Sequence, residues 1–554
     1  MNVKSAAPAV FSLPPTRNEL PLDYAPDSKE RRALDAELRR IAGETLELPL
    51  RIGGRNVRTD RLHPVVVPHD HGHELAHSHW AGEPEVRQAI AAGAEAWQDW
   101  SRMAWEDRAA IFLRASELAR GPWRATLNAV AMLNLSKTVR EADIDATCET
   151  ADYLSFNLRY MREMYAMQPE SMPGSWNRTE YRPLEGFVMA ISPFNFLCLA
   201  NLAYAPAIMG NVVLWKPARQ SELAAWYVLK MLEEAGLPPG VINLVFGDGR
   251  EISTVALDHP DLAGIHFTGS TASFQEIWRT VGANISTYRS YPRLVGETGG
   301  KNFIVAHRSA DVEALATSVL RGAFEFQGQK CSAPSRMYVP ESLWPELRER
   351  LVAEIPHLRV GDPTDSSVFV GAVIDADAYA KHRAAIDEAQ ADAKTEVVAG
   401  GQTTKEVGWF VHPTVVRTSD PDSRLLRDEL FGPIMTSFVY PDGGWAEVLA
   451  QVDRQSPYAL TGAVFANDRY AVAEADAALR HAAGNFYVND KPTGSVVGLQ
   501  PFGGSRASGT NDKATSIWNL SRWVTMRTTK ENLMPARDWR YPFLAPGGKP
   551  DKSR

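Results

Sequence analysis

The chain has 554 residues, of which 44% are hydrophobic and 23% charged, a globular composition that excludes disordered and fibrous classes. Its 59 basic and 67 acidic side chains give a net charge of −8 without a basic block, which excludes nucleic acid and anionic membranes as expected partners. The three cysteines are isolated from one another and leave one unpaired in any pairing, as expected in a reducing compartment.

The amino-terminal region predicts an extended arm followed by a helix. Residues 1–26 contain neither the apolar core of a signal peptide nor an Arg-rich presequence, so we expect a cytoplasmic protein. Residues 28–42 and 84–167 place apolar side chains at helical spacing among charges. The first third of the chain is therefore expected to be mostly helical.

An uncharged stretch over residues 186–215 is longer than the roughly 20 residues that span a bilayer. Pro193, Pro206 and Gly210 interrupt it, so we expect a buried strand, a loop, a helix and a second strand, and no membrane partner. The apolar runs VINLVFGDG and AGIHFTGS follow, separated by helical segments. Buried strands that alternate with helices predict a parallel sheet wound by right-handed crossovers, as in nucleotide-binding proteins.

A second pattern of the same kind begins at Lys301. The strand NFIVAH, a helix from Val312 to Phe326, the loop GQKCSAP and the strand RMYVP follow in that order. Two consecutive doubly wound units leave a cleft between them, and we expect the functional site there.

Two segments outside these units have strand character. SWNRTEYRPLE (Ser175–Glu185) predicts a two-stranded ribbon, and SRWVTMRTTKEN (Ser521–Asn532) predicts a late strand far from any partner in the sequence. Exposed strands pair with other chains unless they are covered. We therefore expect both segments to pair with another subunit, in a homo-oligomer that is at least a dimer.

Cys331 is the first candidate for chemistry. It lies in GQKCSA, a loop of small and polar residues that follows a helix, directly after Lys330. A nearby cation or a favourable backbone dipole lowers the pKa of a thiol and so produces the nucleophilic thiolate. An isolated cysteine is more often a small core residue, which is our interpretation of Cys148 and Cys198.

Glu297 in GETGGKN and Asn195 in SPFNF are the next candidates. The glycines after Glu297 let backbone approach a ligand, although a turn or cap carboxylate is the commoner explanation of such a residue taken alone. The Asn195 amide would either satisfy buried backbone groups or donate to an oxyanion. FTGST (Phe267–Thr271) lies at a strand-to-helix junction, where helix amides attract a pyrophosphate, but no ordered GxGxxG is present.

Six of the 13 histidines lie between His63 and His79. Alternate residues of a strand share a face, so His69, His71 and His73 could in principle present ligands together. The segment is bounded by Pro and Gly, is remote from the cleft motifs and has no cysteine nearby. We therefore expect no metal.

In chain order, SPFNF, LWKP, FTGS, ETGGKN, GQKCSA, DELFGP and PFGGSRASGTNDK resemble the motifs of the aldehyde dehydrogenase superfamily. GETGGKNF, FEFQGQKCSA and NDKPTGSVVGLQPFGGSRASGTNDK look like the members that oxidise L-glutamate γ-semialdehyde in proline catabolism. The resemblance implies an aldehyde dehydrogenase-like α/β fold, with two doubly wound parallel-sheet domains and a small β oligomerisation arm. The implied division is an N-terminal arm and first helix (1–40), an NAD-binding domain (41–170 and 186–300), a catalytic domain (301–510), and an oligomerisation ribbon with the C-terminal tail (171–185 and 511–554).

The resemblance also implies a chemistry. Cys331 would attack the aldehyde carbon, and the Asn195 amide with the Cys331 backbone N–H would hold the oxyanion. Hydride would pass to NAD, leaving a thioester, and Glu297 would activate the water that releases glutamate. The implied NAD-binding residues are Ser192, Lys216, Gly269, Ser270, Glu429 and Phe431.

The implied substrate-binding residues are Ser332, Ser495, Phe196, Phe502, Glu149 and Lys330. Ser332 and the Ser495 loop would offer donors to the substrate carboxylate. Phe196 and Phe502 would sandwich its methylene chain. Glu149 and Lys330 would form a supporting pair near the nucleophile, with an ordinary ion pair as the alternative. An encounter with a proline dehydrogenase is further implied.

Arg219 departs from the pattern, because many relatives place an acidic or small polar residue there, beside the adenosine ribose. An acid excludes a 2′-phosphate whereas an arginine accepts one, so we expect NAD but leave NADP open. Three alternative functions also stay open. They are a dehydrogenase of another semialdehyde such as succinate semialdehyde, a nucleotide-binding protein without turnover, and a cofactor-free thiol hydrolase, for which no His stands beside the cleft motifs.

Overall fold

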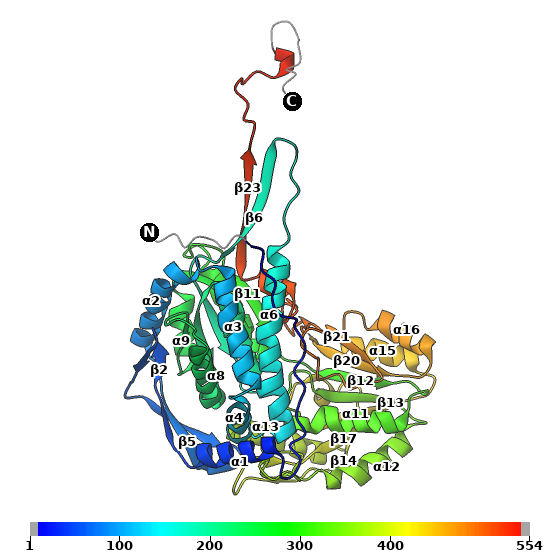
Figure 1. Ribbon diagram of the computed structural model, residues 1–554. Coiled ribbons are helices and arrows are strands. Elements are labelled where there is room, and N and C mark those ends of the chain that lie inside the picture. Colours follow the sequence, from blue (N-terminus) through cyan, green and yellow to red (C-terminus); the bar gives the residue numbers. More distant parts are fainter. Residues whose placement is uncertain (1–8, 545–554) are drawn as a thin grey trace.

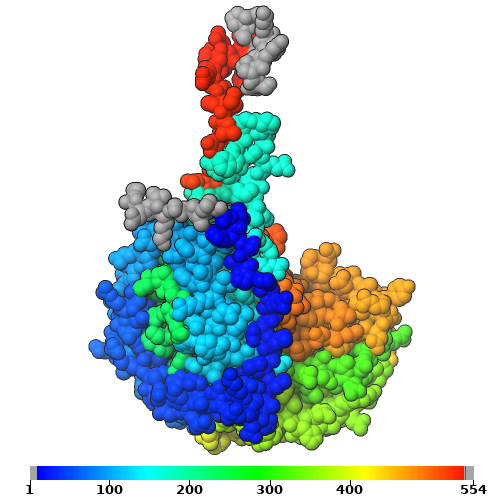
Figure 2. Space-filling view, in the orientation of Figure 1, coloured from blue at the N-terminus to red at the C-terminus, as the bar shows by residue number. Residues whose placement is uncertain are grey.

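The computed structural model describes residues 9–544, which form two α/β bodies and a projecting two-stranded arm (Figure 1). The extended segment before helix α1 (Lys29–Ala42) lies along the surface of the bodies, as predicted for the N-terminal arm (Figure 2). Buried carboxylates hold it in place. Asn18 Nδ2 and the Glu19 N–H donate to Asp152 at 2.9 and 2.8 Å, and the Tyr24 hydroxyl donates to Asp143 at 2.7 Å.

The helical first third is confirmed. It comprises α2 (Glu83–Trp100), α3 (Trp105–Arg120), α4 (Arg124–Leu135), α5 (Val139–Ala142), the π-helix η1 (Asp143–Glu149) and α6 (Thr150–Tyr165). Two small groups of strands precede α2. One is a three-stranded sheet of β1 (Leu46–Leu48), β4 (Leu62–Val67) and β5 (Asp70–His79), and the other is the hairpin of β2 (Leu50–Ile52) and β3 (Arg55–Val57).

The first body contains a seven-stranded sheet in the order β11-β10-β7-β8-β9-β2-β3. Its parallel strands are β7 (Phe187–Ser192), β8 (Val212–Pro217), β9 (Ile242–Leu244), β10 (Leu262–Thr268) and β11 (Arg293–Glu297), and β2 and β3 extend one edge in antiparallel fashion. The connecting helices are α7 (Asn201–Ile208), α8 (Glu222–Glu234), α9 (Gly249–Leu257) and α10 (Thr271–Ala283). The uncharged stretch is thus strand, loop, helix and strand, as predicted.

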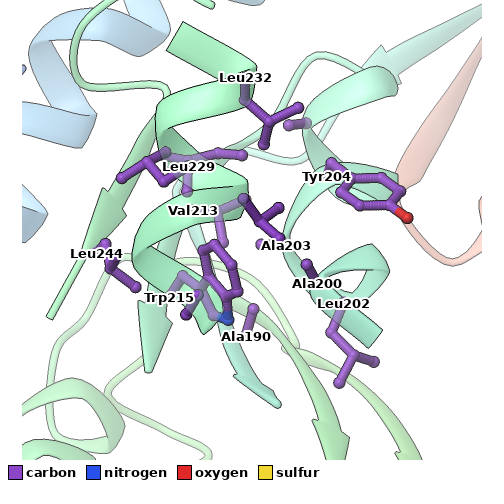
Figure 3. Packing of buried hydrophobic residues seen from close by; sticks show 14 of the residues in the cluster. Ala190, Ala200, Leu202, Ala203, Tyr204, Val213, Trp215, Leu229, Leu232 and Leu244 are labelled. Atoms are coloured by element: carbon purple, nitrogen blue, oxygen red, sulfur yellow. The ribbon is translucent and has the colours of Figure 1, made fainter. Parts of the chain in front are cut away.

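Side chains of β8 show why this stretch is apolar. Trp215 is 1% exposed and lies among Ala190, Ala203 and Leu229 (Figure 3), and its indole N–H donates to Ser192 Oγ at 2.9 Å. The sheet is covered on both faces, so its strands need apolar side chains in both directions. Among residues 9–544, no helix has the length and apolar character needed to cross a membrane.

The second body repeats the design with the sheet order β14-β17-β18-β13-β12-β20-β21. Its strands are β12 (Asn302–Ala306), β13 (Pro334–Pro340), β14 (Thr395–Ala399), β17 (Thr414–Thr418), β18 (Ile434–Tyr440), β20 (Thr461–Phe465) and β21 (Asn485–Val488). Its helices are α11 (Val312–Phe324), α12 (Trp344–Glu354), α13 (Ala376–Ala391), α14 (Arg424–Arg427), α15 (Trp445–Arg454) and α16 (Arg469–Ala478). Short strand pairs β15 (Thr403–Thr404) with β16 (Phe410–Val411) and β19 (Tyr458–Ala459) with β22 (Ser505–Arg506) lie in the loops, and α17 (Ile517–Ser521) precedes the last strand.

The projecting arm corrects one prediction. Residues 175–185 do not form a two-stranded ribbon by themselves, because β6 (Ser175–Pro183) is a single strand paired antiparallel with β23 (Val524–Asn532) of the same chain. The prediction that both segments pair with another subunit stays a prediction, because one edge of each strand is still unpaired among the described residues of this chain. Arg178 with Glu531 and Arg527 with Glu180, each at 2.7 Å, link the two strands. Figure 1 shows the arm standing clear of both bodies.

Candidate active site

A cavity of about 1570 Å³ separates the two bodies. One wall contains the ends of β7, β8 and β10 of the first sheet with residues of α9 and α10, and the other contains Cys331, Lys381, Glu429 and Phe431. Small-molecule sites measure about 300–1,000 Å³. The cavity therefore has room for a ligand larger than a single metabolite.

Cys331 lies on a rigid turn between the 3₁₀ helix η4 (Glu325–Gly328) and β13. Gly328 has φ 63°, and a Cβ there would lie 2.6 Å from the Gly432 carbonyl oxygen, so only glycine fits. The Gln329 side-chain oxygen accepts from the Ile374 N–H at 2.9 Å, and Asn302 Nδ2 donates to the Cys331 carbonyl at 2.7 Å. The nucleophile candidate is thus held on both sides.

Asn195 joins the two bodies at this turn. It follows β7, is 3% exposed, and its Nδ2 donates to the Gln329 carbonyl at 3.1 Å, two residues before Cys331. The amide has a second N–H, and Asn195 and Cys331 both line the cavity. The structure therefore brings together these two predicted residues, which are far apart in the sequence.

Glu297 is the last residue of β11 and lies beside the cavity, because the next residue, Thr298, is part of the cavity lining. Its carboxylate accepts from the Gly504 N–H at 3.3 Å. Burial raises the pKa of Glu297 well above its usual range, against the opposing effects of Gly504 and Lys513. The carboxyl group is near enough to Cys331 to raise the pKa of the thiol.

The thiol of Cys331 is not activated by Lys330, contrary to the prediction. Burial raises the pKa of Cys331 to about 12, and the charges of Glu297 and Glu429 act in the same direction. Lys330 Nζ lies 3.2 Å from Glu325, so its charge is engaged by a neighbouring carboxylate. The backbone N–H groups of Ser332 and Cys331 oppose the rise in the pKa of the thiol, so the favourable groups are dipoles rather than a cation.

All six residues predicted to bind the dinucleotide line the cavity: Ser192, Lys216, Gly269, Ser270, Glu429 and Phe431. Lys216 is buried, and its ammonium has no hydrogen-bond partner in the described part of the chain, so a ligand hydroxyl would supply one. Glu429 accepts from the Gly300 N–H at 2.8 Å, and a Cβ at Gly299 would lie 2.4 Å from its Oε2. These features fit a dinucleotide.

The first turns of two helices also face the cavity. Gly249 and Arg250 begin α9, and Ser270, Ala272 and Ser273 begin α10, and all five line the cavity. Unpaired amides and the helix dipole attract anions at such ends. The FTGST junction and the residues that begin α9 therefore both present a helix N-terminus to the cavity.

The six predicted substrate-binding residues are not on the cavity lining. Ser332 is buried, and its hydroxyl is hydrogen-bonded to that of Thr493 at 2.7 Å, two residues before Ser495. The Phe196 ring lies 6.3 Å from that of Phe326, and Phe502 pairs with Ala514 in an isolated bridge. These contacts place Ser332 and the Ser495 loop together and leave the roles of all six residues as proposals.

The predicted Glu149–Lys330 pair is not formed. Glu149 instead accepts from the Cys198 thiol at 3.2 Å, and burial raises the pKa of Glu149 to about 7. Lys330 is bound to Glu325, as described above. The sequence could not identify these partners, because the directions of the Glu149 and Lys330 side chains are set by packing in the folded chain. Cys198 and Cys148 are buried, as predicted.

Arg219 lies outside the cavity lining. Its Nη2 is 3.0 Å from Asp377 and 3.4 Å from Asp375, both near the start of α13. The guanidinium is therefore turned toward the second body, where two carboxylates compete with any phosphate for it.

The histidine segment forms β5 and its turn, and its rings have separate partners. His69 Nδ1 contacts Ser136 Oγ at 3.0 Å, His71 Nε2 contacts the Lys405 carbonyl at 2.9 Å, and His79 Nε2 contacts Glu47 at 2.8 Å. His77 lies 3.0 Å from Glu74, and His63 stacks on Trp80. Among the described residues, the one trio of potential ligand atoms is Asp145, Glu149 and Cys198, where Lys137 already occupies Asp145 at 2.6 Å.

Sequence reasoning missed Lys381, Lys137 and Asp145. Lys381 on α13 lines the cavity near Glu429, and no motif surrounds it. Lys137 and Asp145 form a buried ion pair at 2.6 Å next to the Asn195 turn. The two residues are eight positions apart, and a π-helix begins between them. The spacing of an ordinary α-helix therefore does not predict that they meet.

Comparison with known proteins gives concordant results. A family model described as "Aldehyde dehydrogenase family" matches residues 56–529. The crystal structure of the Delta-pyrroline-5-carboxylate dehydrogenase from Mycobacterium tuberculosis bound with NAD is 50% identical, with a TM-score of 0.94 over 97% of this chain and 100% of that chain. The Delta-1-pyrroline-5-carboxylate dehydrogenases, mitochondrial, of Dictyostelium discoideum and Homo sapiens are 44% and 45% identical. They cover 96% and 95% of this chain, and 96% and 94% of their own lengths are matched.

Alkylation of Cys331 by iodoacetamide without cofactor should be slow at pH 7 and should rise about tenfold per pH unit up to about pH 10. A thiol with a pKa of about 12 is almost wholly protonated over that range, and only the thiolate reacts. Peptide mass spectrometry measures the modified fraction, with the buried Cys148 and Cys198 as internal controls. A rate that levels off between about pH 7 and pH 9 would contradict the raised pKa.

Proposed function

This chain belongs to the aldehyde dehydrogenase family, and we propose that it oxidises L-glutamate γ-semialdehyde, the open form of Δ1-pyrroline-5-carboxylate, to L-glutamate with NAD. The observation that carries the proposal is the meeting of Cys331 and Asn195 at one cavity, with Glu297 beside it. The relatives described above carry the substrate in their names. This reaction is the second step of proline degradation.

In the proposed mechanism, the Cys331 thiolate adds to the aldehyde carbon and forms a thiohemiacetal. The second N–H of the Asn195 amide and the backbone N–H of Cys331 would donate to the developing oxyanion. When bound, NAD would supply the hydride acceptor and a positively charged nicotinamide ring, which would also favour the thiolate form of Cys331. Ser192, Lys216, Gly269, Ser270, Glu429 and Phe431 would hold it.

Oxidation leaves a thioester on Cys331, which water must hydrolyse. Glu297 would accept a proton from the water as its oxygen attacks the acyl carbon, and the C–S bond then breaks to release glutamate and the Cys331 thiolate. Burial raises the pKa of Glu297, and a carboxylate with a raised pKa is a stronger base toward the attacking water.

Substrate selection would depend on the distal carboxylate and ammonium. Ser332 and the Ser495 loop are proposed to bind the carboxylate, and Phe196 and Phe502 to hold the methylene chain between them. Their support is the hydrogen bond that ties Ser332 to the loop through Thr493. Glu149 and Lys330 are proposed to act near the nucleophile, as separate groups instead of a pair.

We also propose a homo-oligomer, at least a dimer, formed through the β6–β23 arm. Trp176 is 54% and Met526 66% exposed on that arm. Both outer edges of a two-stranded ribbon have unpaired backbone groups, which a second subunit could cover. An encounter with a proline dehydrogenase stays a prediction.

The expected cytoplasmic location also stays a prediction, and the comparisons do not favour it. The Dictyostelium discoideum and Homo sapiens relatives are named mitochondrial. Both the cytoplasm and the mitochondrial matrix keep thiols reduced, so the proposed chemistry of Cys331 applies in either compartment.

Purified enzyme should reduce NAD with glutamate semialdehyde at a kcat/KM at least about 100-fold above that for succinate semialdehyde, because a site that binds an ammonium leaves polar groups unpaired when it is missing. Absorbance at 340 nm follows the reaction. Cys331→Ala is the control and should bind NAD but show no turnover. Equal efficiency with both semialdehydes would favour the succinate semialdehyde alternative, and turnover by Cys331→Ala would refute the nucleophile.

Glu297→Gln should give a normal first burst of reduced cofactor and then a steady-state rate lower by about 100-fold or more, because acylation proceeds while water is not activated. Stopped-flow absorbance separates the two phases, and mass spectrometry of the quenched enzyme would find the acyl group on Cys331. An unchanged steady-state rate would exclude Glu297 as the base.

Arg219→Gln should change the ratio of kcat/KM for NADP to that for NAD by less than about threefold, because the guanidinium is paired with Asp375 and Asp377. Wild-type enzyme should prefer NAD. Initial rates with both cofactors provide the measurement. A large loss of NADP use in the variant would mean that Arg219 turns to the cofactor.

A further inference from the structure

The segment Gly503–Lys513 surrounds the carboxyl group of Glu297 with backbone. The Gly504 N–H donates to this carboxylate, and a Cβ on Gly503 would lie only 2.9 Å from Glu297 Oε1. The backbone of Glu297 pairs with Gly509 in an isolated antiparallel bridge. The position of the carboxylate therefore depends on the conformation of this segment.

Lys513 ends the segment and holds it together. Its Nζ donates to the Gly484 carbonyl at 2.8 Å, to the Gly503 carbonyl at 3.0 Å and to Asn485 Oδ1 at 3.3 Å. All three acceptors are neutral, and no carboxylate pairs with Lys513 in the described residues. Its positive charge is therefore not neutralised by an ion pair. The ammonium of Lys513 is hydrogen-bonded to the carbonyl of Gly503, and the N–H of the next residue, Gly504, donates to the carboxylate of Glu297.

The backbone around Lys513 is unusual for residues with side chains. Asn511, Lys513 and Thr515 have φ values of 55°, 53° and 58°, in the left-handed region. Such conformations cost about 1–3 kcal/mol each and persist where surrounding contacts impose them, often at functional sites. Here the three hydrogen bonds of the Lys513 ammonium are among those contacts.

The charged groups around Glu297 come from several elements. Lys513 lowers the pKa of Glu297, and Asp512 raises it. The charge of Glu297 in turn raises the pKa of the Tyr153 hydroxyl on α6 and of the Cys331 thiol. Asp512 accepts a hydrogen bond from Thr510 and lies 3.3 Å from Arg522. Lys513 is thus the cation that acts on Glu297 among the described residues.

We propose that Lys513 is a positioning residue for Glu297, which holds the Gly503–Gly504 backbone against the carboxylate and supplies the positive charge that lets it serve as a base. The proposal rests on the proposed role of Glu297 in deacylation. Lys513 takes no proton in the reaction. The proton of the attacking water moves to Glu297 and then to solvent, while the acyl–sulfur bond breaks and the electron pair returns to Cys331.

Lys513→Met tests the proposal, since it keeps the length of the side chain and removes its charge. The acidic limb of the pH profile of the steady-state rate should move up by about one pH unit, because without the cation Glu297 stays protonated to higher pH. The rate should therefore fall by up to about tenfold on the acidic side of the profile and approach the wild-type rate on the alkaline side. The burst of reduced cofactor and the KM for NAD should change less than about threefold.

Lys513→Arg is the matched control and should keep the wild-type limb, since it retains charge and donors. In the Glu297→Gln background, Lys513→Met should cause no further loss, because its effect acts through the missing carboxylate. An unmoved acidic limb, or a further loss in that background, would overturn the proposal. If Lys513→Met does not fold, Lys513→Gln takes its place. Its acidic limb should then lie at higher pH than that of Lys513→Arg. Normal turnover of Glu297→Gln would remove the premise of this proposal, because Glu297 would then not be the base. A wild-type enzyme that does not oxidise glutamate semialdehyde would instead refute the proposed function.

Discussion

A buried ion pair holds the candidate site together. Lys137 and Asp145 lie 2.6 Å apart and are each 1% exposed. Asp145 also accepts from the Leu197 and Cys198 N–H groups, at 2.9 and 3.0 Å, and so fixes the turn that presents Asn195. Loss of one partner would leave an uncompensated buried charge, which costs about 3–5 kcal/mol.

The same lysine reaches the other body. Its Nζ lies 4.4 Å from the centre of the Phe196 ring and 4.2 Å from that of Phe326, five residues before Cys331. One ammonium thus contacts the turn with the amide donor and the segment that leads to the nucleophile. The segment is strained at Phe326 and Gln327, with φ of 51° and 56°, and the Gln327 side chain stabilises it through the Ser136 and Ala372 carbonyls.

Much of this architecture could be predicted from local pattern, because strands covered on both faces must be apolar throughout. The strand pattern predicted a cleft between two wound units, and the family resemblance implied that Cys331 and Asn195 meet there. Short edge strands such as β2 and β3 carry no such signal. The partner of Lys330 and the raised pKa of Cys331 also escaped prediction, since burial and side-chain direction are set by contacts distant in sequence. The pairing of β6 with β23 escaped for the same reason.

The β6–β23 arm imposes an order of events during synthesis. Arg178 and Glu531, which face each other across it, are 353 positions apart, so β6 leaves the ribosome long before its partner strand exists. Contacts of such high sequence separation form late. Both wound bodies can therefore finish folding while β6 is still an unpaired strand. A nascent chain that stalls before residue 524 would expose that strand to chaperones or to aggregation, and full translation closes the last hydrogen-bonded ladder of the subunit.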